Sequence, residues 1–431
     1  MPVAVFNKEI SSYVRNDIRI TLEGNALFLE HLDTDSIKEF ELEQTEKFKT
    51  QKEVYDLRKD SLAYRKDHRI WLYYDLYTVK KDNGYYQFIN DLKYNDGIER
   101  YYVYDRDLSE IEELFSEEQK RYLVRFGSMM HKLLYLSAEK VLTAFYGFST
   151  ISPFGTEAEE GKYLDIIKFE TIYLQHGVLH ANLVLKNHVE RCRADKIVIS
   201  SYFEKDNYMK KYGYEEGDLI CTGMARYDHI DRKRASRNRI LFAPSWRQYL
   251  TFVQSASKWE VLENKIISSD YYTKFMEFLT DKKLYQLLEK YDLHLDFKLH
   301  PIIRDAKNLF QVENDRIHLA PEAVDVEDYK IFITDFSSYV FDYACLNRPV
   351  IYFVPDMDQF KSGMNHYREL DLPFEKAFGN LCLEATETVS EIEKIAENNF
   401  EPEEKFENRM SEFFFDLDHC ADKLYKYLIN E

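Results

Sequence analysis

A corner with two serines and an acid interrupts the apolar segments in the second half of the chain. The stretch "ITDFSSYVFDYACLNRPVIYF", residues 333–353, has the pattern of a buried strand, a corner, a short helix and a second strand. The first N–H groups of a helix lack partners and carry partial positive charge, so such a corner can bind an anion. Asp335, Ser337 and Ser338 are therefore candidate phosphate ligands, and the alternative is that one serine only caps the helix.

Two histidines follow predicted strands in the same way. His176 ends "FETIYLQHG", where Gly177 permits a tight turn, and His300 ends "LHLDFKLHP", where Pro301 stops the strand. Imidazole titrates near neutral pH, so His176 is a candidate general base, and His300 is a candidate donor to phosphate oxygens. The alternative for each histidine is a structural role in a turn or against the backbone.

Two arginines and one further acid complete the set of candidate ligands. Arg247 ends the strand-like segment "RILFAPSWR", and Arg226 lies in "TGMARYD". The planar guanidinium group suits phosphate because it can donate two parallel hydrogen bonds; the alternative for both is a surface arginine. Asp342, in the helix after Ser338, could contact a ribose hydroxyl, although a solvated helix acid is the simpler interpretation.

Together these groups suit phosphoryl transfer, in which positioning and charge stabilisation supply most of the catalysis. The sequence has no carboxylate pair typical of a glycosidase, no glycine-rich phosphate loop and no cluster of metal-binding side chains. It therefore predicts no tight metal site and requires no cofactor, and it leaves the need for a divalent metal ion open.

Composition limits the partners and the compartment. The 431 residues carry a formal net charge of −19, so we expect no binding to nucleic acid through a global basic field. The five scattered cysteines form no Cys-x-x-Cys pair and fit a reducing cytoplasm. The start has no signal-peptide core, and no apolar run reaches the length of about 18 residues that spans a membrane, which leaves peripheral attachment open.

Strands and helices alternate from His68 onward, which predicts parallel sheets with helices on both faces. We expect an α/β fold with two doubly wound Rossmann-type domains facing across a cleft, with ligands beyond the carboxyl ends of the strands. The expected units are an N-terminal appendage at 1–65, a first domain at 66–230, a second domain at 231–391 and a C-terminal helical tail at 392–431.

Seven segments, taken in order, resemble the CDP-glycerol:poly(glycerophosphate) glycerophosphotransferases, the family of teichoic-acid-type and capsule-polymer polymerases. Each segment alone is weak, but the ordered set is specific and spans about residues 66–370. The segments read "KKDNGYYQFINDL", "YLSAEKVLTAFYG", "YLQHGV", "KKYGYEEGDLICTGMARYD", "FAPSWR", "KLHP" and "ITDFSSYVFDYACLNRPVIYF".

The resemblance implies a fold of the GT-B type, with the acceptor on the first domain and the nucleotide donor on the second. It implies that His176 and His300 are the two key histidines, and that the corner from Asp335 to Ser338 and Arg247 bind donor phosphate. The implied reaction moves glycerol phosphate, or a related polyol phosphate, from CDP-glycerol or CDP-ribitol to a polymer or lipid-linked acceptor and releases CMP. A cytoplasmic enzyme at the inner face of the cell membrane, in teichoic acid or capsule polysaccharide biosynthesis, fits this reaction.

The chain also departs from the family pattern. Gly223 and Arg226, which the resemblance places beside the donor, flank Met-Ala where the family commonly has Leu-Pro, and the stretch after His176-Gly177 reads "VLHANLVLKN". The acceptor, the polyol, the number of units added and whether the chain belongs to a longer polymerase therefore stay open. Two other classes remain as alternatives: a nucleotide-sugar-dependent glycosyltransferase or epimerase of the same fold, and a non-catalytic binding subunit.

Overall fold

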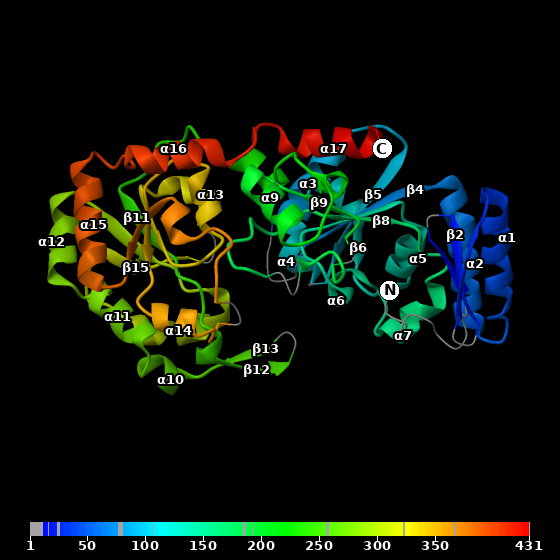
Figure 1. Ribbon diagram of the computed structural model, residues 1–431, viewed down its shortest axis with the longest axis horizontal. Helices are drawn as coiled ribbons and strands as arrows, with labels where there is room; N and C mark the ends of the chain where they lie inside the picture. Colours follow the sequence, from blue (N-terminus) through cyan, green and yellow to red (C-terminus); the bar gives the residue numbers. More distant parts are fainter. Residues whose placement is uncertain are drawn as a thin grey trace.

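Two α/β domains lie side by side, and a small N-terminal unit lies at the outer end of the first domain (Figure 1). The computed structural model describes residues 12–15, 17–23, 26–75, 81–105, 107–183, 187–192, 194–255, 258–321, 324–365 and 368–430. The two doubly wound domains predicted from the alternating pattern are confirmed by two separate parallel sheets.

The first domain is built on a parallel sheet of seven strands in the order β10-β9-β8-β7-β4-β5-β6. The order reverses between β4 and β7, so the carboxyl ends of these strands form a switch point at which ligands bind in such sheets. The strands are β4 (Arg69–Tyr74), β5 (Ile98–Tyr104), β6 (Leu123–Arg125), β7 (Lys140–Thr143), β8 (Glu170–Tyr173), β9 (Lys196–Val198) and β10 (Leu219–Ile220).

Both faces of the first sheet are covered, as the alternation along β4 shows. Trp71 and Tyr73 belong to the core that includes helices α3 (Asn83–Asp91) and α17 (Cys420–Asn430), whereas Ile70 and Leu72 belong to the core on the opposite face. Successive strand residues point to opposite faces, so a strand buried on both sides is apolar throughout. The remaining helices here are α4 (Leu108–Ile111), α5 (Met129–Ser137), α6 (Phe148–Ile151), α7 (Glu157–Glu160) and α9 (Tyr202–Lys210).

The second domain has a parallel sheet of six strands in the order β15-β14-β11-β16-β17-β18. Its switch point lies between β11 and β16. The strands are β11 (Arg239–Phe242), β14 (His294–Phe297), β15 (Ile317–Leu319), β16 (Ile331–Thr334), β17 (Val350–Phe353) and β18 (Gly379–Cys382), and a separate hairpin pairs β12 (Thr251–Ser255) with β13 (Lys258–Val261).

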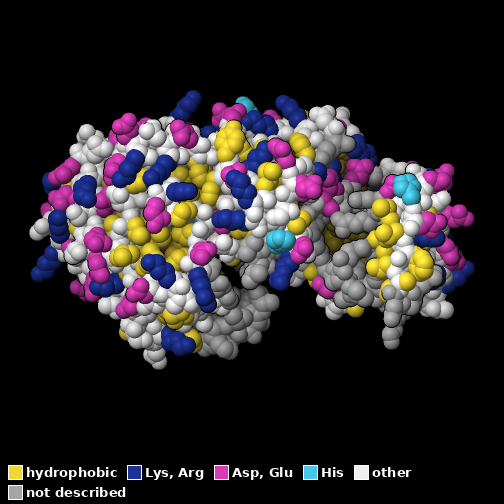
Figure 2. Space-filling model, in the orientation of Figure 1, with side chains coloured by type: hydrophobic (Ala, Val, Ile, Leu, Met, Phe, Trp, Pro, Cys, Tyr) yellow, Lys and Arg dark blue, Asp and Glu magenta, His cyan; other side chains and the backbone are white. Residues whose placement is uncertain are grey.

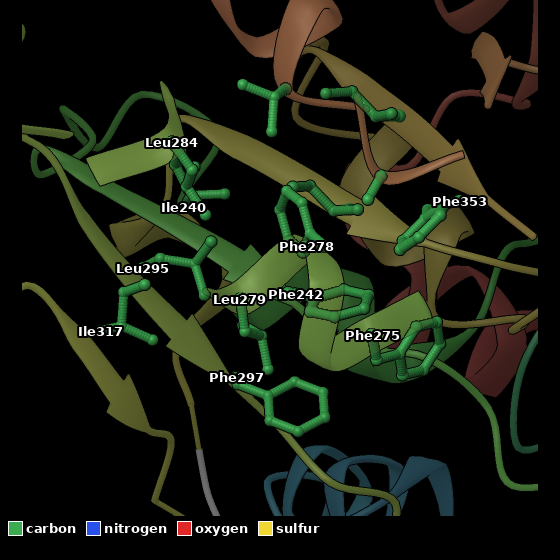
Figure 3. Packing of buried hydrophobic residues seen from close by; sticks show 14 of the residues in the cluster. Ile240, Phe242, Phe275, Phe278, Leu279, Leu284, Leu295, Phe297, Ile317 and Phe353 are labelled. Carbon is green, nitrogen blue, oxygen red and sulfur yellow. The ribbon is translucent and has the colours of Figure 1, made fainter. Parts of the chain in front are cut away.

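Aromatic packing stabilises one face of the second sheet. Phe242 of β11 lies 4.9 Å from Phe275 and 5.4 Å from Phe278 between ring centres, and Phe353 of β17 packs on the same rings (Figure 3). Such pairs contribute about 0.5–1.5 kcal/mol each beyond the area they bury. The helices of this domain are α10 (Glu263–Ile267), α11 (Asp270–Leu279), α12 (Lys282–Lys290), α13 (Val340–Ala344), α14 (Met357–Lys361) and α15 (Ala385–Glu397).

The C-terminal segment connects the two domains. Helix α16 (Glu404–Phe413) lies along the second domain, and α17 then runs over the first (Figure 1). There Tyr425 stacks on Tyr94 at 3.6 Å between ring centres, and Gln87 donates a hydrogen bond of 2.9 Å to the carbonyl of Ala421. The expected boundary between residues 391 and 392 falls inside α15, and the tail beyond α15 belongs to both domains.

The N-terminal unit is an antiparallel sheet of β1 (Ser12–Arg15), β2 (Ile18–Glu23) and β3 (Ala26–His31), followed by α1 (Thr34–Glu46) and α2 (Lys52–Asp67). The expected boundary at residue 65 falls inside α2. This helix is joined to the first domain by a fully buried pair in which Arg58 donates bonds of 2.7 and 2.5 Å to Asp165. Figure 2 shows apolar side chains exposed on the N-terminal unit. Leu27, Phe28 and Leu29 of β3 are each more than half exposed.

Across the described ranges, no helix combines the length and the apolar character needed to cross a bilayer.

Candidate active site

His176 lies just beyond the carboxyl end of β8, on the first domain. Its side chain is about half exposed, at 49% of the full area, whereas the residue before it, Gln175, is completely buried. Gln175 has a φ of 59°, a conformation that costs a non-glycine residue free energy and persists only where its surroundings hold it. Its amide group is held by the carbonyl of Val198 at 2.7 Å and by Glu204 at 2.9 Å. A buried network therefore holds the backbone that presents His176.

The ring of His176 is oriented by a buried carboxylate. Nδ1 of His176 is hydrogen bonded to Asp82, the N-cap residue of α3, which is 1% exposed. With Asp82 ionised, Nδ1–H is the donor to the carboxylate, and Nε2 is then the nitrogen that can accept a proton. Phe145 packs against the ring at 4.6 Å. This arrangement holds one imidazole in one tautomer beside the cleft.

A second carboxylate lies at the same helix start. Asp75, which follows β4, accepts hydrogen bonds of 2.9 and 2.8 Å from the backbone N–H groups of Gly84 and Tyr85. Burial and the neighbouring charge of Asp82 raise the pKa of Asp75 above its ordinary value. Asp82 itself accepts the N–H of Asn83, at 2.8 Å through Oδ1, which leaves its Oδ2 to pair with His176.

Arg226 bridges the two domains. Its guanidinium group donates to Asp342 of α13 at 2.6 Å and to the carbonyl of His176, and lies 3.5 Å from Asp82. Burial acts to lower the pKa of Arg226, but Asp342 and Asp82 outweigh it and hold that pKa above its usual range. Asp342 is thus paired with an arginine of the first domain. The contacts of Arg226 favour a role in joining the domains over direct contact with donor phosphate.

Asp335 organises the switch point of the second sheet. It follows β16 directly and accepts two hydrogen bonds of 3.0 Å from the backbone N–H of Ser245, after β11, and one of 3.2 Å from the N–H of Ser337. Its carboxylate is fully buried. Asp335 therefore ties the ends of the two central strands together and shapes the corner that carries the serines.

Arg247 is also fully buried, and four of its five N–H donors are occupied. It donates to Asp335 at 2.6 Å, and to Asp356, which follows β17, at 2.5 and 2.7 Å. Its remaining bond goes to the carbonyl of Ser245 at 2.9 Å. These contacts favour a positioning role, in which Arg247 stabilises the corner electrostatically, over the predicted direct contact with phosphate.

The two serines of the corner have different surroundings. The hydroxyl of Ser337 accepts a bond of 3.2 Å from the N–H of Tyr339, which is a local turn contact. The hydroxyl of Ser338 lies beside Gly177, and a side-chain carbon added there would come within 3.6 Å of it. Helix α13 is only five residues long, so its dipole contributes less than expected. The hydroxyl of Ser338 thus faces the residue next to His176.

His300 lies after β14 near the positively charged side chains of Lys298 and Arg304. Burial, followed by the charges of Lys298, His176 and Arg304, lowers the pKa of His300 to about 4, so the ring is neutral at pH 7. Its Nδ1 accepts a bond of 3.3 Å from the N–H of Ile302, so Nε2 carries the proton. A neutral donor among cations can bind an oxyanion.

Gly223 lies apart from this cluster. It has a φ of 79°, and a side-chain carbon at this position would come within 2.6 Å of the sulfur of Cys420 in α17. Glycine is needed there for both the backbone conformation and the close approach of the C-terminal helix. These contacts favour a structural role over the predicted place beside the donor.

Three acids of the site were not predicted from the sequence. Asp82 stands in the Asp-Asn-Gly segment that predicts the start of α3, whereas Asp75 and Asp356 follow the strand-like runs "RIWLYY" and "VIYFVP". An acid just after a predicted strand, or at a helix start, is the signal that could have indicated all three. Among the described side chains, no group of three or more His, Cys, Asp or Glu is arranged to hold a metal ion.

Curated relatives of the chain take part in teichoic acid synthesis. It is 25% identical over 354 residues to the minor teichoic acid biosynthesis protein GgaB of Bacillus subtilis, which covers 80% of this chain and 38% of GgaB. It is 26% identical over 248 residues to the teichoic acid poly(ribitol-phosphate) polymerase of Bacillus spizizenii, which covers 53% and 36% of the two chains. The chain thus spans less than two-fifths of the length of either relative.

Among solved structures, the chain is similar to the wall teichoic acid polymerase TagF. One TagF structure superimposes with a TM-score of 0.58 at 14% identity, covering 91% of this chain and 97% of the other. A histidine variant of TagF soaked with CDPG gives a TM-score of 0.59 at 15% identity and the same coverage. At this identity the likeness shows the fold alone, and the fold is GT-B-like, as predicted.

The family itself is shown by a match over most of the chain. Residues 63–429 match the family described as CDP-Glycerol:Poly(glycerophosphate) glycerophosphotransferase. This range contains both sheets, the two histidines and the serine corner. The chain therefore belongs to the CDP-glycerol:poly(glycerophosphate) glycerophosphotransferase family.

Proposed function

We propose that the protein transfers a polyol phosphate from a CDP-linked donor to a hydroxyl of a teichoic-acid-like or capsular polymer. CDP-glycerol is the first candidate donor and CDP-ribitol the second, because a ribitol-phosphate polymerase is among the relatives. The acceptor oxygen attacks the phosphorus nearer the polyol, the bond from that phosphorus to the bridging oxygen breaks, and CMP leaves. The acceptor proton passes to Nε2 of His176.

His176 is the proposed general base. A hydroxyl is a poor nucleophile and gains most from a base, whereas CMP leaves as a phosphate monoester with a second pKa near 6 and needs little acid assistance. Asp82 stabilises the imidazolium that forms, because its carboxylate is already bonded to Nδ1. Asp82 thereby acts through His176 as a positioning residue.

The second domain supplies the proposed donor site. Nε2–H of His300 and the hydroxyls of Ser337 and Ser338 donate to the diphosphate oxygens. Asp335 and Arg247 hold the corner from beneath, since both are fully buried and bonded to each other at 2.6 Å. We assign the interdomain pair of Arg226 and Asp342 to alignment of the domains and keep Asp342 as the candidate contact for the ribose.

One observation carries this proposal: an oriented histidine on the first domain faces a serine corner at the switch point of the second. The contact is direct, because Ser338 lies against Gly177, the residue after His176. In open α/β sheets, ligands bind at such switch points. This supports a donor phosphate bound between the corner and the base.

Release of CMP tests the proposal. The protein is incubated with CDP-glycerol or CDP-ribitol, with and without a short polyol-phosphate acceptor, and CMP is measured together with extension of the acceptor. We expect acceptor-dependent CMP from one of the two donors. Release of UDP from a UDP-sugar, with no CMP from either donor, would overturn the proposal in favour of a sugar transferase or epimerase. Binding of CDP without any turnover would favour the non-catalytic subunit.

A further inference from the structure

His180, which the proposed mechanism does not use, follows a strand of the first domain in the sequence but is buried among side chains of the second domain. It follows His176 by four residues, in a loop that leaves the first sheet, and is 1% exposed. Its ring packs on side chains of the second domain, with ring centres 5.6 Å from Phe341 of α13 and 6.3 Å from Tyr352 of β17. A loop of the first domain thus inserts an imidazole into the core behind the serine corner.

The same loop is fixed to the second domain by its backbone. The carbonyl of His180 accepts a bond of 2.8 Å from the N–H of Asp371, and Ala181 forms an antiparallel bridge with Leu370. Val178 belongs to the apolar cluster built from β11, β16 and α13. We name residues 178–182 the anchor loop. Because Gly177 alone separates it from His176, the base and the donor corner are mechanically connected.

Both ring nitrogens of His180 lack a hydrogen-bond partner among the described residues. Burial lowers the pKa of His180 to about 4, and the adjacent backbone of Ser337 and Phe336 acts against that shift. The neutral ring therefore lies beside the backbone of Ser337, Phe336 and Leu372, near enough for that backbone to favour the protonated ring, but neither nitrogen has hydrogen-bond geometry. Burying an unpaired polar group destabilises a protein, so it calls for a functional explanation.

We propose that His180 is a positioning residue for donor binding: when the donor diphosphate enters, a ring N–H of His180 bonds to a backbone carbonyl of Phe336 or Ser337. That bond fixes the corner against the anchor loop and aligns His176 with the donor phosphorus. The inference rests on the proposed function for its donor, but not for the contacts of His180.

The test replaces His180 by phenylalanine, which keeps the ring and removes both nitrogens. His180→Phe should leave the Tm of the free protein unchanged or raise it, because an unpaired buried polar group is lost. It should lower the affinity for CDP about tenfold in calorimetry, and lower turnover at saturating donor at least as much, because a misplaced base is costly. A purely structural residue would show no loss of affinity at unchanged Tm.

His131→Phe is the matched control. His131 is equally buried in the first domain, but both its nitrogens are bonded, to the N–H of Gly127 at 3.0 Å and to the hydroxyl of Tyr74 at 2.9 Å. This variant should lower the Tm while CDP affinity and turnover at permissive temperature stay normal. His180→Gln, which restores a buried donor, should recover part of the CDP affinity.

Wild-type CDP affinity and turnover in His180→Phe would overturn the inference. The inference would also be overturned if His180→Phe lowered both the Tm and the CDP affinity and His180→Gln recovered no CDP affinity. Because calorimetry with CDP needs no turnover, failure of the proposed reaction in the wild-type protein is recognised separately, by the absence of CMP release.

Discussion

His176 and His300 occupy equivalent places, each just beyond a parallel strand, yet their surroundings differ in charge and exposure. His176 is half exposed and its Nδ1 is bonded to the buried carboxylate of Asp82. His300 is more enclosed, and burial together with Lys298, His176 and Arg304 lowers its pKa to about 4. One histidine faces the cleft with an anion behind it, and the other lies among cations.

The difference assigns the two roles. A carboxylate behind an imidazole favours the imidazolium that forms when the ring accepts a proton, which suits a base. Cations around an imidazole disfavour that state and attract anions, which suits a group that donates a hydrogen bond to the diphosphate. The comparison is therefore between a residue that acts on the acceptor and a residue that acts on the donor.

Replacing His176 by alanine should have the largest effect. A general base contributes about 10²–10⁴-fold to rate, so turnover should fall by that factor. Donor affinity measured without acceptor should stay within about twofold, because an interaction made only in the transition state does not change ground-state binding. CMP release and calorimetry measure the two quantities. Near-normal turnover with polymer acceptor present would remove the base assignment.

Asp82→Asn should give the next largest effect on the same side of the comparison. The amide keeps the size of the side chain but loses the charge that stabilises the imidazolium and fixes the tautomer. We expect turnover to fall about 10–100-fold, the range typical for the loss of a group that orients a catalytic histidine or ligand. Donor affinity should not change. A variant that lost donor affinity but kept its turnover at saturating donor would show that Asp82 acts on donor binding and not through His176.

Much of this arrangement could be predicted from the sequence, because strand periodicity is a local property. The ends of β8, β14 and β16 can be predicted from short apolar runs. These ends place His176, His300 and Asp335 just beyond the carboxyl ends of parallel strands. The pairing of Asp82 with His176 joins residues 94 positions apart and depends on how α3 packs on the sheet. No local pattern contains that contact.

Side-chain burial, like the contact between Asp82 and His176, could not be predicted from the sequence. Arg247 reads as an exposed arginine at a strand end, yet Asp335 and Asp356 enclose it, because three different strands end at that point. The position of Gly223 beneath α17 likewise depends on a helix that returns from the far end of the chain. Residue type and spacing indicated the chemistry, whereas tertiary packing decides which groups remain available to a ligand.

The role of His300 in donor binding can be tested by the pH dependence of donor affinity. A bound diphosphate favours the protonated form of His300, so donor binding should raise its pKa from about 4 toward the ordinary value near 6.5. Between these values the complex takes up a proton that the free protein does not, so donor affinity rises as pH falls. For that shift, linkage gives a gain of about 30-fold between pH 8 and pH 5.

Calorimetry in buffers of different ionisation enthalpy measures both the affinity and the proton uptake. His300→Ala should remove the pH dependence and weaken binding at pH 5 more than at pH 8, while His176→Ala should retain the dependence. A pH profile that survives in His300→Ala would assign the titration to another group.

The smallest expected effect separates the two serines of the corner. Ser338 faces Gly177 across the cleft, and a hydrogen bond to a charged group contributes about 1.5–3 kcal/mol, so Ser338→Ala should weaken donor binding by about tenfold or somewhat more, with little change in Tm. Ser337 accepts a hydrogen bond from the N–H of Tyr339 in a local turn, so Ser337→Ala should lower the free energy of unfolding by about 0.5–1.5 kcal/mol, the usual net contribution of one hydrogen bond. Calorimetry and urea unfolding of both variants, each the control for the other, measure these effects. If Ser338→Ala binds the donor normally, the corner serves His176 and the fold but not the phosphate, and the donor site must be sought nearer His300 and Lys298.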